Sequence, residues 1–214
     1  TWQHVETFNG GPGFGSSVAL AASGRHLVVG DPEANSGDGE VIVYWKAWGE
    51  SWWQLGADIN GDPGDAAGTS VDMSDDGNRI VVGVPGADGS AGNAGRTRVL
   101  EWDGDSWNDS NALWSDADEP IYGDSAGGQE GIAVSVSADG NTVASAAIGA
   151  GATSPGTVSV ASIAPIHVDS GGPVDIGLGM SDGGWQEDVD CAVFADGVAR
   201  CAGHSVRSWV QRPD

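Results

Sequence analysis

Short runs of β-branched and apolar residues alternate with turn residues along most of the chain. The clearest runs are Leu27–Gly30, Ile80–Gly83 and Val143–Ser145, and each follows a turn that contains glycine. Such runs, bounded by Gly, Asp, Asn and Pro, are typical of β-strands. Helical spacing of apolar residues is absent, so the sequence predicts an all-β protein with no helix longer than one turn.

One pattern recurs and divides the chain into units. A segment such as Gly15–Val18 or Gly68–Val71 precedes a turn, and an apolar run follows the turn. The turn glycines are separated by 53, 63 and 57 residues, and they are Gly24, Gly77, Gly140 and Gly197. A repeat of this length is typical of propeller blades or of a solenoid.

Each unit continues in the same order, with a Gly-rich loop, a β-branched run, a short turn and a last strand that carries tryptophan. This order predicts a β-propeller-like array of about four four-stranded antiparallel blades, either incomplete or a small propeller, in one domain over residues 1–214. We expect units at about 14–62, 67–118, 130–175 and 185–214. Thr1–His4 resemble Trp53–Leu55, so we expect residues 1–10 to form the outer strand of a closing blade.

Acidic residues far outnumber basic ones and restrict the partners. The chain has 8 Lys and Arg against 31 Asp and Glu, a formal net charge of −23. Such a surface repels phosphate backbones and anionic lipids, so we expect neither nucleic acid nor a membrane surface as partner. It attracts proteins with basic surfaces and divalent cations, although solubility alone also explains the charge. No stretch has the length and hydropathy of a membrane helix, so we expect no direct membrane insertion.

The two cysteines point to a compartment. Cys191 and Cys201 lie at equal distances from the expected turn Ala195–Gly197, so a hairpin would place them opposite each other. A cross-strand disulfide favours an oxidising compartment, so we expect a secreted protein or one in an organelle lumen. The alternative is a pair of buried free thiols. The N-terminus lacks the features of a signal peptide, so any targeting segment is missing from this chain.

The repeat resembles a known family. Its consensus reads Gly-x-Ser-Val-x-x-Ser-x-Asp-Gly-Asn-x-x-x-Val-Gly-x-Pro, followed by Gly-x-x-x-Val-x-x-Trp-x-Gly-x-x-Trp-x-Gln-Leu-Gly. This is similar to the integrin-α/FG-GAP-like β-propeller repeats, over Gly15 to about Val160. The resemblance implies a propeller that binds proteins or glycans, with Ca²⁺ in the blade loops of some members. The segment Cys191–Gly203 is similar to a blade hairpin of the regulator-of-chromosome-condensation-like repeats.

A calcium site is the first candidate for chemistry. Oxygen-bearing side chains alternate at Asp58, Asn60 and Asp62, and Asp65 follows closely. Calcium prefers six to eight oxygen ligands, and this start is similar to the family's calcium loops. Pro63 and the early position of Asp65 depart from that pattern, and turn residues of this kind also serve backbone conformation alone.

Ten tryptophans form the second candidate. Exposed tryptophan on a rigid scaffold anchors proteins or stacks on sugars, whereas recurring tryptophans pack between blades. We expect packing for four that recur, namely Trp45, Trp53, Trp102 and Trp107. Trp48 and Trp52 break the repeat, so we expect them to contact a partner.

Catalytic constellations are missing from the sequence pattern. The histidines lack metal-ligand spacing, and no serine lies in a Gly-x-Ser-x-Gly motif. We therefore expect a non-catalytic protein-interaction or scaffold module, such as an accessory subunit docked on a larger membrane assembly. The alternative is a calcium-dependent or glycan-binding adhesion module. A second alternative is an enzyme of unknown reaction with its site in the propeller centre.

Overall fold

The computed structural model describes residues 3–47, 49–89, 91–102, 114–149 and 155–163, and the backbone of two strands near the C-terminus. The chain divides into two units, Thr1–Ile163 and Ala164–Asp214, and each is described by itself. The regular secondary structure of the described residues is β-strand apart from one short helical turn, α1 (Ala34–Gly37). The all-β prediction is confirmed. Within the described residues no helix is long and apolar enough to cross a membrane.

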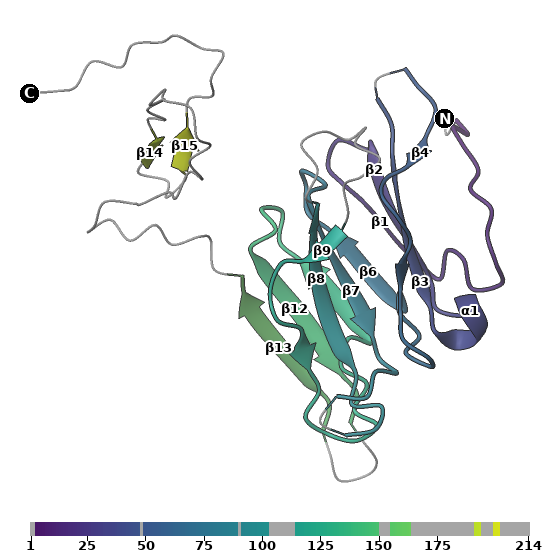
Figure 1. The fold of residues 1–214 in the computed structure, drawn as a ribbon, viewed down its shortest axis with the longest axis vertical. Helices are drawn as coiled ribbons and strands as arrows, with labels where there is room; N and C mark the ends of the chain where they lie inside the picture. The colour runs from purple at the N-terminus through teal and green to yellow at the C-terminus, as the bar shows by residue number, and fades with distance from the viewer. Residues whose placement is uncertain are drawn as a thin grey trace, which may run out of the picture. The chain divides into compact units, whose positions relative to one another are not determined.

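The first unit contains three antiparallel sheets that lie side by side in chain order (Figure 1). Sheet 1 consists of β1 (Ser17–Leu20), β2 (His26–Asp31), β3 (Glu40–Trp45), β4 (Trp53–Gln54) and β5 (Ile59–Asn60). Sheet 2 consists of β6 (Ser70–Met73), β7 (Arg79–Val84), β8 (Arg96–Trp102), β9 (Trp114–Asp116) and β10 (Ile121–Tyr122). Sheet 3 consists of β11 (Ala133–Val136), β12 (Thr142–Ala147) and β13 (Thr157–Ser162).

The turn glycines occupy equivalent places in the three sheets. Gly24, Gly77 and Gly140 each close the hairpin between the first two strands of a sheet, with φ of 63°, 80° and 73°. Each glycine N–H donates to the carbonyl oxygen three residues earlier, at 2.8, 3.0 and 2.8 Å. Positive φ favours glycine because a Cβ would be strained there. The conformation of these three glycines therefore supports a repeat over sheets 1 to 3, whereas Gly197 lies outside the described residues.

An aspartate fixes the same turn in sheets 2 and 3. Asp76 accepts hydrogen bonds from the Ser74 hydroxyl at 2.6 Å and the Asn78 backbone N–H at 2.9 Å. Asp139 accepts the equivalent pair from Ser137 and Asn141, at 2.5 and 3.1 Å. The Ser-x-Asp-Gly-Asn motif is thus a turn in which the carboxylate satisfies backbone and side-chain donors.

Neighbouring sheets approach through a contact between serine and glycine. The Ser17 hydroxyl donates to the carbonyl oxygen of Gly68 in the next sheet at 2.8 Å, and Ser70 donates to Gly131 at 2.8 Å. A Cβ at Gly30 would clash with the carbonyl oxygen of Gly68. We call this arrangement the Ser–Gly contact. It lets two backbones meet where only glycine fits.

The Ser–Gly contact recurs between sheets 2 and 3, where a Cβ at Gly83 would clash with the carbonyl oxygen of Gly131. In sheet 3, however, the register places Ala133 opposite Ala146, where sheet 1 pairs Ser17 with Gly30. Sheet 3 therefore lacks both residues that make the Ser–Gly contact with a following sheet.

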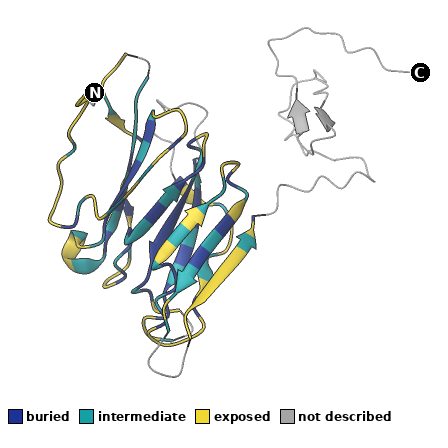
Figure 2. Ribbon diagram, turned by 180° about the vertical axis from the view of Figure 1, so that it is seen from behind, coloured by how far each residue is buried: buried dark blue, intermediate teal, exposed yellow. Residues whose placement is uncertain are grey.

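Two apolar clusters fill the spaces between the sheets. The larger lies between sheets 1 and 2 (the first interface) and includes Val41, Val43, Val82 and Leu100. The smaller lies between sheets 2 and 3 (the second interface) and includes Val81, Val99, Val143 and Ile163. Burial is therefore greatest in the facing strands, as Figure 2 shows.

The expected four-stranded blades need correction. In sheets 1 and 2 the outer position is shared by two short strands that both pair with the third, so each sheet has five strands. In sheet 3 the structure describes three strands, and the sheets do not close into a barrel. Residues 3–10, expected as an outer strand, have no strand pairing. Sheets 1 and 2 have five strands and not four because the loops after β4 and β9 divide the outer strand into two short strands.

The second unit has one described hairpin, β14 (Cys191–Val193) paired with β15 (Ala199–Cys201). Its register places Cys191 opposite Cys201, as the spacing predicts. The expected turn Ala195–Gly197 lies outside the described residues. The positions of the two cysteines in the hairpin are confirmed, and the disulfide itself stays a prediction.

Candidate interaction surface

Equivalent positions hold a cation–aromatic pair in sheet 1 and an aromatic pair in sheet 2. In sheet 2, Trp102 lies opposite Trp114, with ring centroids 5.5 Å apart. In sheet 1 the backbone N–H of Lys46 donates the hydrogen bond that the backbone N–H of Trp102 donates in sheet 2, so Lys46 is equivalent to Trp102. The Lys46 ammonium lies 4.7 Å from the Trp52 ring centroid. A cation over an aromatic face is an attractive contact. Trp52 therefore takes the place of Trp114, and does not break the repeat.

The expected equivalence of Trp45 and Trp102 is wrong by one residue. In the hairpin register, Trp45 pairs with His26 and Glu101 pairs with Arg79, so Trp45 corresponds to Glu101. Because side chains alternate between the faces of a strand, a shift of one residue moves a side chain to the opposite face. Trp45 therefore faces sheet 2, whereas Trp102 faces sheet 1.

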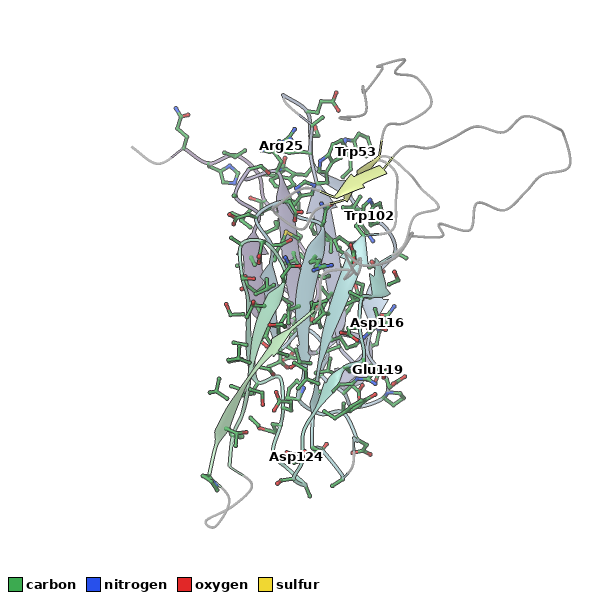
Figure 3. All side chains as sticks on the ribbon, turned by 90° about the vertical axis from the view of Figure 1, so that its left-hand side faces the viewer. Arg25, Trp53, Trp102, Asp116, Glu119 and Asp124 are labelled. Atoms are coloured by element: carbon green, nitrogen blue, oxygen red, sulfur yellow. The ribbon has the colours of Figure 1, made fainter. Side chains whose placement is uncertain are left out.

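Burial separates the remaining tryptophans. Trp102 is buried in the first interface, and Trp45 is partly buried against it, which confirms a packing role for both. Trp53 is 63% exposed, so its expected packing role is wrong. Figure 3 places Trp53 and Trp102 at the same end of the sheets, far from Asp124. Trp48 and Trp107 lie outside the described residues.

The N-terminal segment covers part of sheet 1. Phe8 packs on Tyr44 with ring centroids 4.5 Å apart, and on Trp52 at 5.5 Å. Trp52 is half-buried as a result. Its expected contact with a partner stays a prediction, because the exposed part of the ring is still available.

Strand β1 of sheet 1 presents exposed apolar side chains on the side away from sheet 2. Val18 and Leu20 of β1 are 61% and 60% exposed. Their equivalents in sheet 2, Val71 and Met73, are 8% and 6% exposed because sheet 1 covers them. These two positions of sheet 1 carry apolar side chains like those buried in the first interface, but expose them.

Strand β13 of sheet 3 presents apolar side chains that none of the described residues covers, on the side away from sheet 2. Val158 and Val160 of β13 are 72% and 70% exposed, and Figure 2 shows this strand exposed along its length. The register makes them equivalent to Val41 and Val43, which are fully buried in the first interface. At both ends of the described stack, apolar side chains are therefore exposed whose equivalents are buried between the sheets.

A polar network replaces apolar packing at one place in the second interface. The Ser145 hydroxyl donates to the Glu130 carboxyl group, and Thr97 lies 2.5 Å from the Ser145 oxygen. Because the single hydroxyl proton of Ser145 is donated to Glu130, the Thr97 hydroxyl is the donor to the Ser145 oxygen. All three side chains are buried. The sequence alone does not reveal this network, because its residues come from three separate segments.

The proposed calcium ligands do not converge. Asp58 accepts a hydrogen bond from the Gln54 amide at 2.7 Å, and Asn60 accepts one from Asn35 at 3.0 Å. Within the described ranges, no group of three or more His, Cys, Asp or Glu side chains is placed to hold a metal ion. The calcium site stays a prediction to which the arrangement of these side chains lends no support.

Asp62 and Asp65 share a cation from the next sheet. The Arg96 guanidinium lies 3.2 Å from Asp62 and 2.9 Å from Asp65. Burial raises the pKa of the Asp65 carboxyl group above its ordinary value, and the charge of Arg96 offsets part of that rise. Arg96 is an interface residue that the sequence analysis missed. The sequence held a signal for this ion pair, because an arginine in a chain with 8 basic and 31 acidic residues is expected to pair with a carboxylate.

Histidine takes part in packing between sheets. His26 is buried, and a Cβ at Gly77 would clash with its ring, so the ring lies on the turn of sheet 2. Burial lowers its pKa to about 4, the charge of Arg25 adds to the lowering, and Asp76 opposes it. At the second interface Arg79 takes the equivalent position and donates to Asn141 at 2.7 Å.

Comparisons with protein-family models and with curated proteins found no match for this chain.

Proposed function

We propose that this protein is a non-catalytic interaction module made of propeller-like blades, which docks on a protein or a larger assembly through an end face of its sheet stack. The observation that carries the proposal is the exposure of Val158 and Val160, whose equivalents are fully buried between sheets. Large apolar side chains gathered on one exposed face are typical of protein interaction sites.

The repeated geometry supports the propeller-like interpretation. Three sheets follow each other in chain order, their turn glycines are equivalent, and the same Ser–Gly contact joins each sheet to the next. Consecutive antiparallel sheets that pack face to face are the blade plan of a propeller. The opposed positions of Cys191 and Cys201 support a secreted or lumenal location.

The charge supports a basic partner. A formal net charge of −23 raises the rate at which a basic surface meets the protein, and that rate falls with added salt. The apolar end faces would then hold the partner after the encounter. We therefore expect partner retention to weaken, but not to vanish, at high salt.

A paired pull-down tests the proposal. We would immobilise the wild type, Val158→Asp, Leu20→Asp and the control Ser115→Asp, which adds the same charge at an exposed site in β9. We expect one of the two end-face variants to retain at least about tenfold less of a specific protein from the native source than the wild type does. Ser115→Asp should retain as much of it as the wild type. Equal retention by all four proteins, or no retained protein, would show that the proposal is wrong.

Glycan binding is a second candidate, favoured by Trp53. Its ring is 63% exposed. Sugars stack on exposed aromatic rings. This candidate predicts that Trp53→Ala removes binding on a glycan array. Its calcium-dependent form also predicts that calcium raises the Tm and that a chelator reverses the rise.

A further inference from the structure

A polar pocket opens at the second interface. It encloses about 270 Å³ and is lined by loops and strand ends of sheets 2 and 3. Its polar and aromatic lining residues include Tyr122, Asp124, Ser125, Glu130, Thr157 and Ser159. The Glu130 side chain is buried, with one carboxyl oxygen bonded to Ser145. None of the described residues that line this pocket is an arginine or a lysine.

An equivalent pocket at the first interface contains a cation. It encloses about 260 Å³ and is lined in part by Asp62, Asp65, Asp88 and Arg96. The Arg96 guanidinium reaches into it and pairs with Asp62 at 3.2 Å and Asp65 at 2.9 Å. In this pocket the protein neutralises its own carboxylates with an internal arginine.

Backbone register fixes how the two pockets correspond. Arg96 pairs with Val84, and Thr157 pairs with Ala147, so Thr157 occupies the position of Arg96. The backbone N–H groups of Gly61 and Gly123 each donate a hydrogen bond to the carbonyl oxygen of a glycine in the preceding loop. Gly123 is therefore equivalent to Gly61, and Asp124 is equivalent to Asp62. The second pocket thus keeps the acid, has a short hydroxyl side chain in place of the cation, and gains the buried Glu130.

We propose that the pocket at the second interface binds the guanidinium group of a partner's arginine, which takes the place that Arg96 fills at the first interface. The inference rests on the proposed function and names the chemistry of the partner. Asp124 and Glu130 supply acceptors for the planar cation, as Asp62 and Asp65 do for Arg96. Tyr122, which is 49% exposed, supplies an aromatic ring beside them.

A small probe tests the pocket without any macromolecular partner. The probe is N-acetyl-arginine amide, and N-acetyl-citrulline amide is its neutral control of nearly the same shape. We would follow the backbone amide signals of Glu130 and Thr157 by heteronuclear NMR during titration at low salt. We expect saturable shifts with the arginine probe and at least about tenfold weaker binding of the citrulline probe. Equal shifts with both probes would overturn the proposal.

Two reciprocal variants sharpen the test. Thr157→Arg recreates at the second interface the internal cation of the first, so we expect it to abolish probe binding and to raise the Tm. Arg96→Thr removes the internal cation, so we expect a second binding site for the arginine probe near Asp65. Asp116→Asn, at an exposed acid paired with Arg98 in sheet 2, is the control and should leave probe binding unchanged. Unchanged probe binding in Thr157→Arg contradicts the proposal.

The failure of this inference is distinguishable from the failure of the proposed function. If the pull-down retains a partner that Thr157→Arg still binds with full affinity, the pocket assignment is wrong and the interaction module stands. If the probe binds but no protein is retained from the native source, the pocket stands and the interaction module is wrong.

Discussion

The two interfaces between sheets share one backbone geometry but differ in side-chain chemistry. At the first interface the equivalent positions hold Val41, Ala67 and Val82, which pack in the apolar cluster. At the second interface they hold Thr97, Glu130 and Ser145, which form a buried hydrogen-bonded network. The Ser–Gly contact is the same at both. Close approach of the backbones therefore defines the repeat, and the side chains around it are free to differ.

The largest expected effect comes from disturbing the shared geometry. Gly83→Ala places a Cβ against the carbonyl oxygen of Gly131, so the sheets must move apart. We expect the free energy of unfolding to fall by about 3 kcal/mol or more, measured by urea denaturation. Ala146→Gly, at the equivalent position of sheet 3, is the control and should cost only about 1 kcal/mol. Similar losses in both variants would refute the special role of the contact.

The next largest effect tests the polar network. Ser145→Val removes a hydrogen-bond donor from the buried Glu130, and we expect it to cost about 2–3 kcal/mol in urea denaturation. The triple variant Thr97→Val, Glu130→Ala and Ser145→Val copies the first interface. We expect it to recover most of that loss, because no polar group is then left unpaired. A triple variant less stable than Ser145→Val would mean that the two interfaces are not interchangeable.

Acid should weaken the first interface more than the second. The pKa of His26 is lowered to about 4, so between pH 6.5 and 4 the unfolded chain binds a proton that the folded chain does not. The free energy of unfolding therefore falls with decreasing pH, by about 2 kcal/mol between pH 8 and pH 5. We expect His26→Gln to remove this part of the pH dependence in urea titrations. An unchanged pH profile in the variant would contradict this assignment.

The smallest effect concerns the serine of the contact. Ser70→Ala removes the hydroxyl that donates to Gly131 at 2.8 Å, and we expect a loss of about 1 kcal/mol. Ala133→Ser, at the equivalent position of sheet 3, should leave the Tm unchanged, because the structure describes no following sheet for it to contact. A stabilising Ala133→Ser would reveal a covering sheet on that side.

The sequence predicted the parts of the fold that depend on local backbone conformation. Gly24, Gly77 and Gly140 were identifiable because a turn with positive φ leaves little choice of residue. The sequence did not predict the position of Trp102 relative to Trp45, because β8 extends one residue beyond β3. Matching the sequence pattern aligned the two tryptophans, whereas the hydrogen bonds align Trp45 with Glu101. Register is a property of pairing, and a single strand does not contain it.

The candidate site was harder to predict for a related reason. Asp58 and Asp62 are near each other in sequence, yet one bonds to Gln54 in its own sheet and the other pairs with Arg96 in the next. Sequence proximity suggested a shared cation, whereas the fold divides the acids between sheets. The pocket beside Glu130 depends on three segments and became visible only through comparison with its equivalent at the first interface.

The alanines at positions 133 and 146 give the stack a direction. Sheet 1 still carries Gly15 at φ 86° with open space around it, so its outer side can accept the serine of another such sheet. Sheet 3 cannot offer that serine, and its Cβ at Ala146 blocks the close approach that glycine allows. Addition of like sheets by this contact is therefore one-way: the described stack can accept another sheet beside sheet 1 but not beside sheet 3.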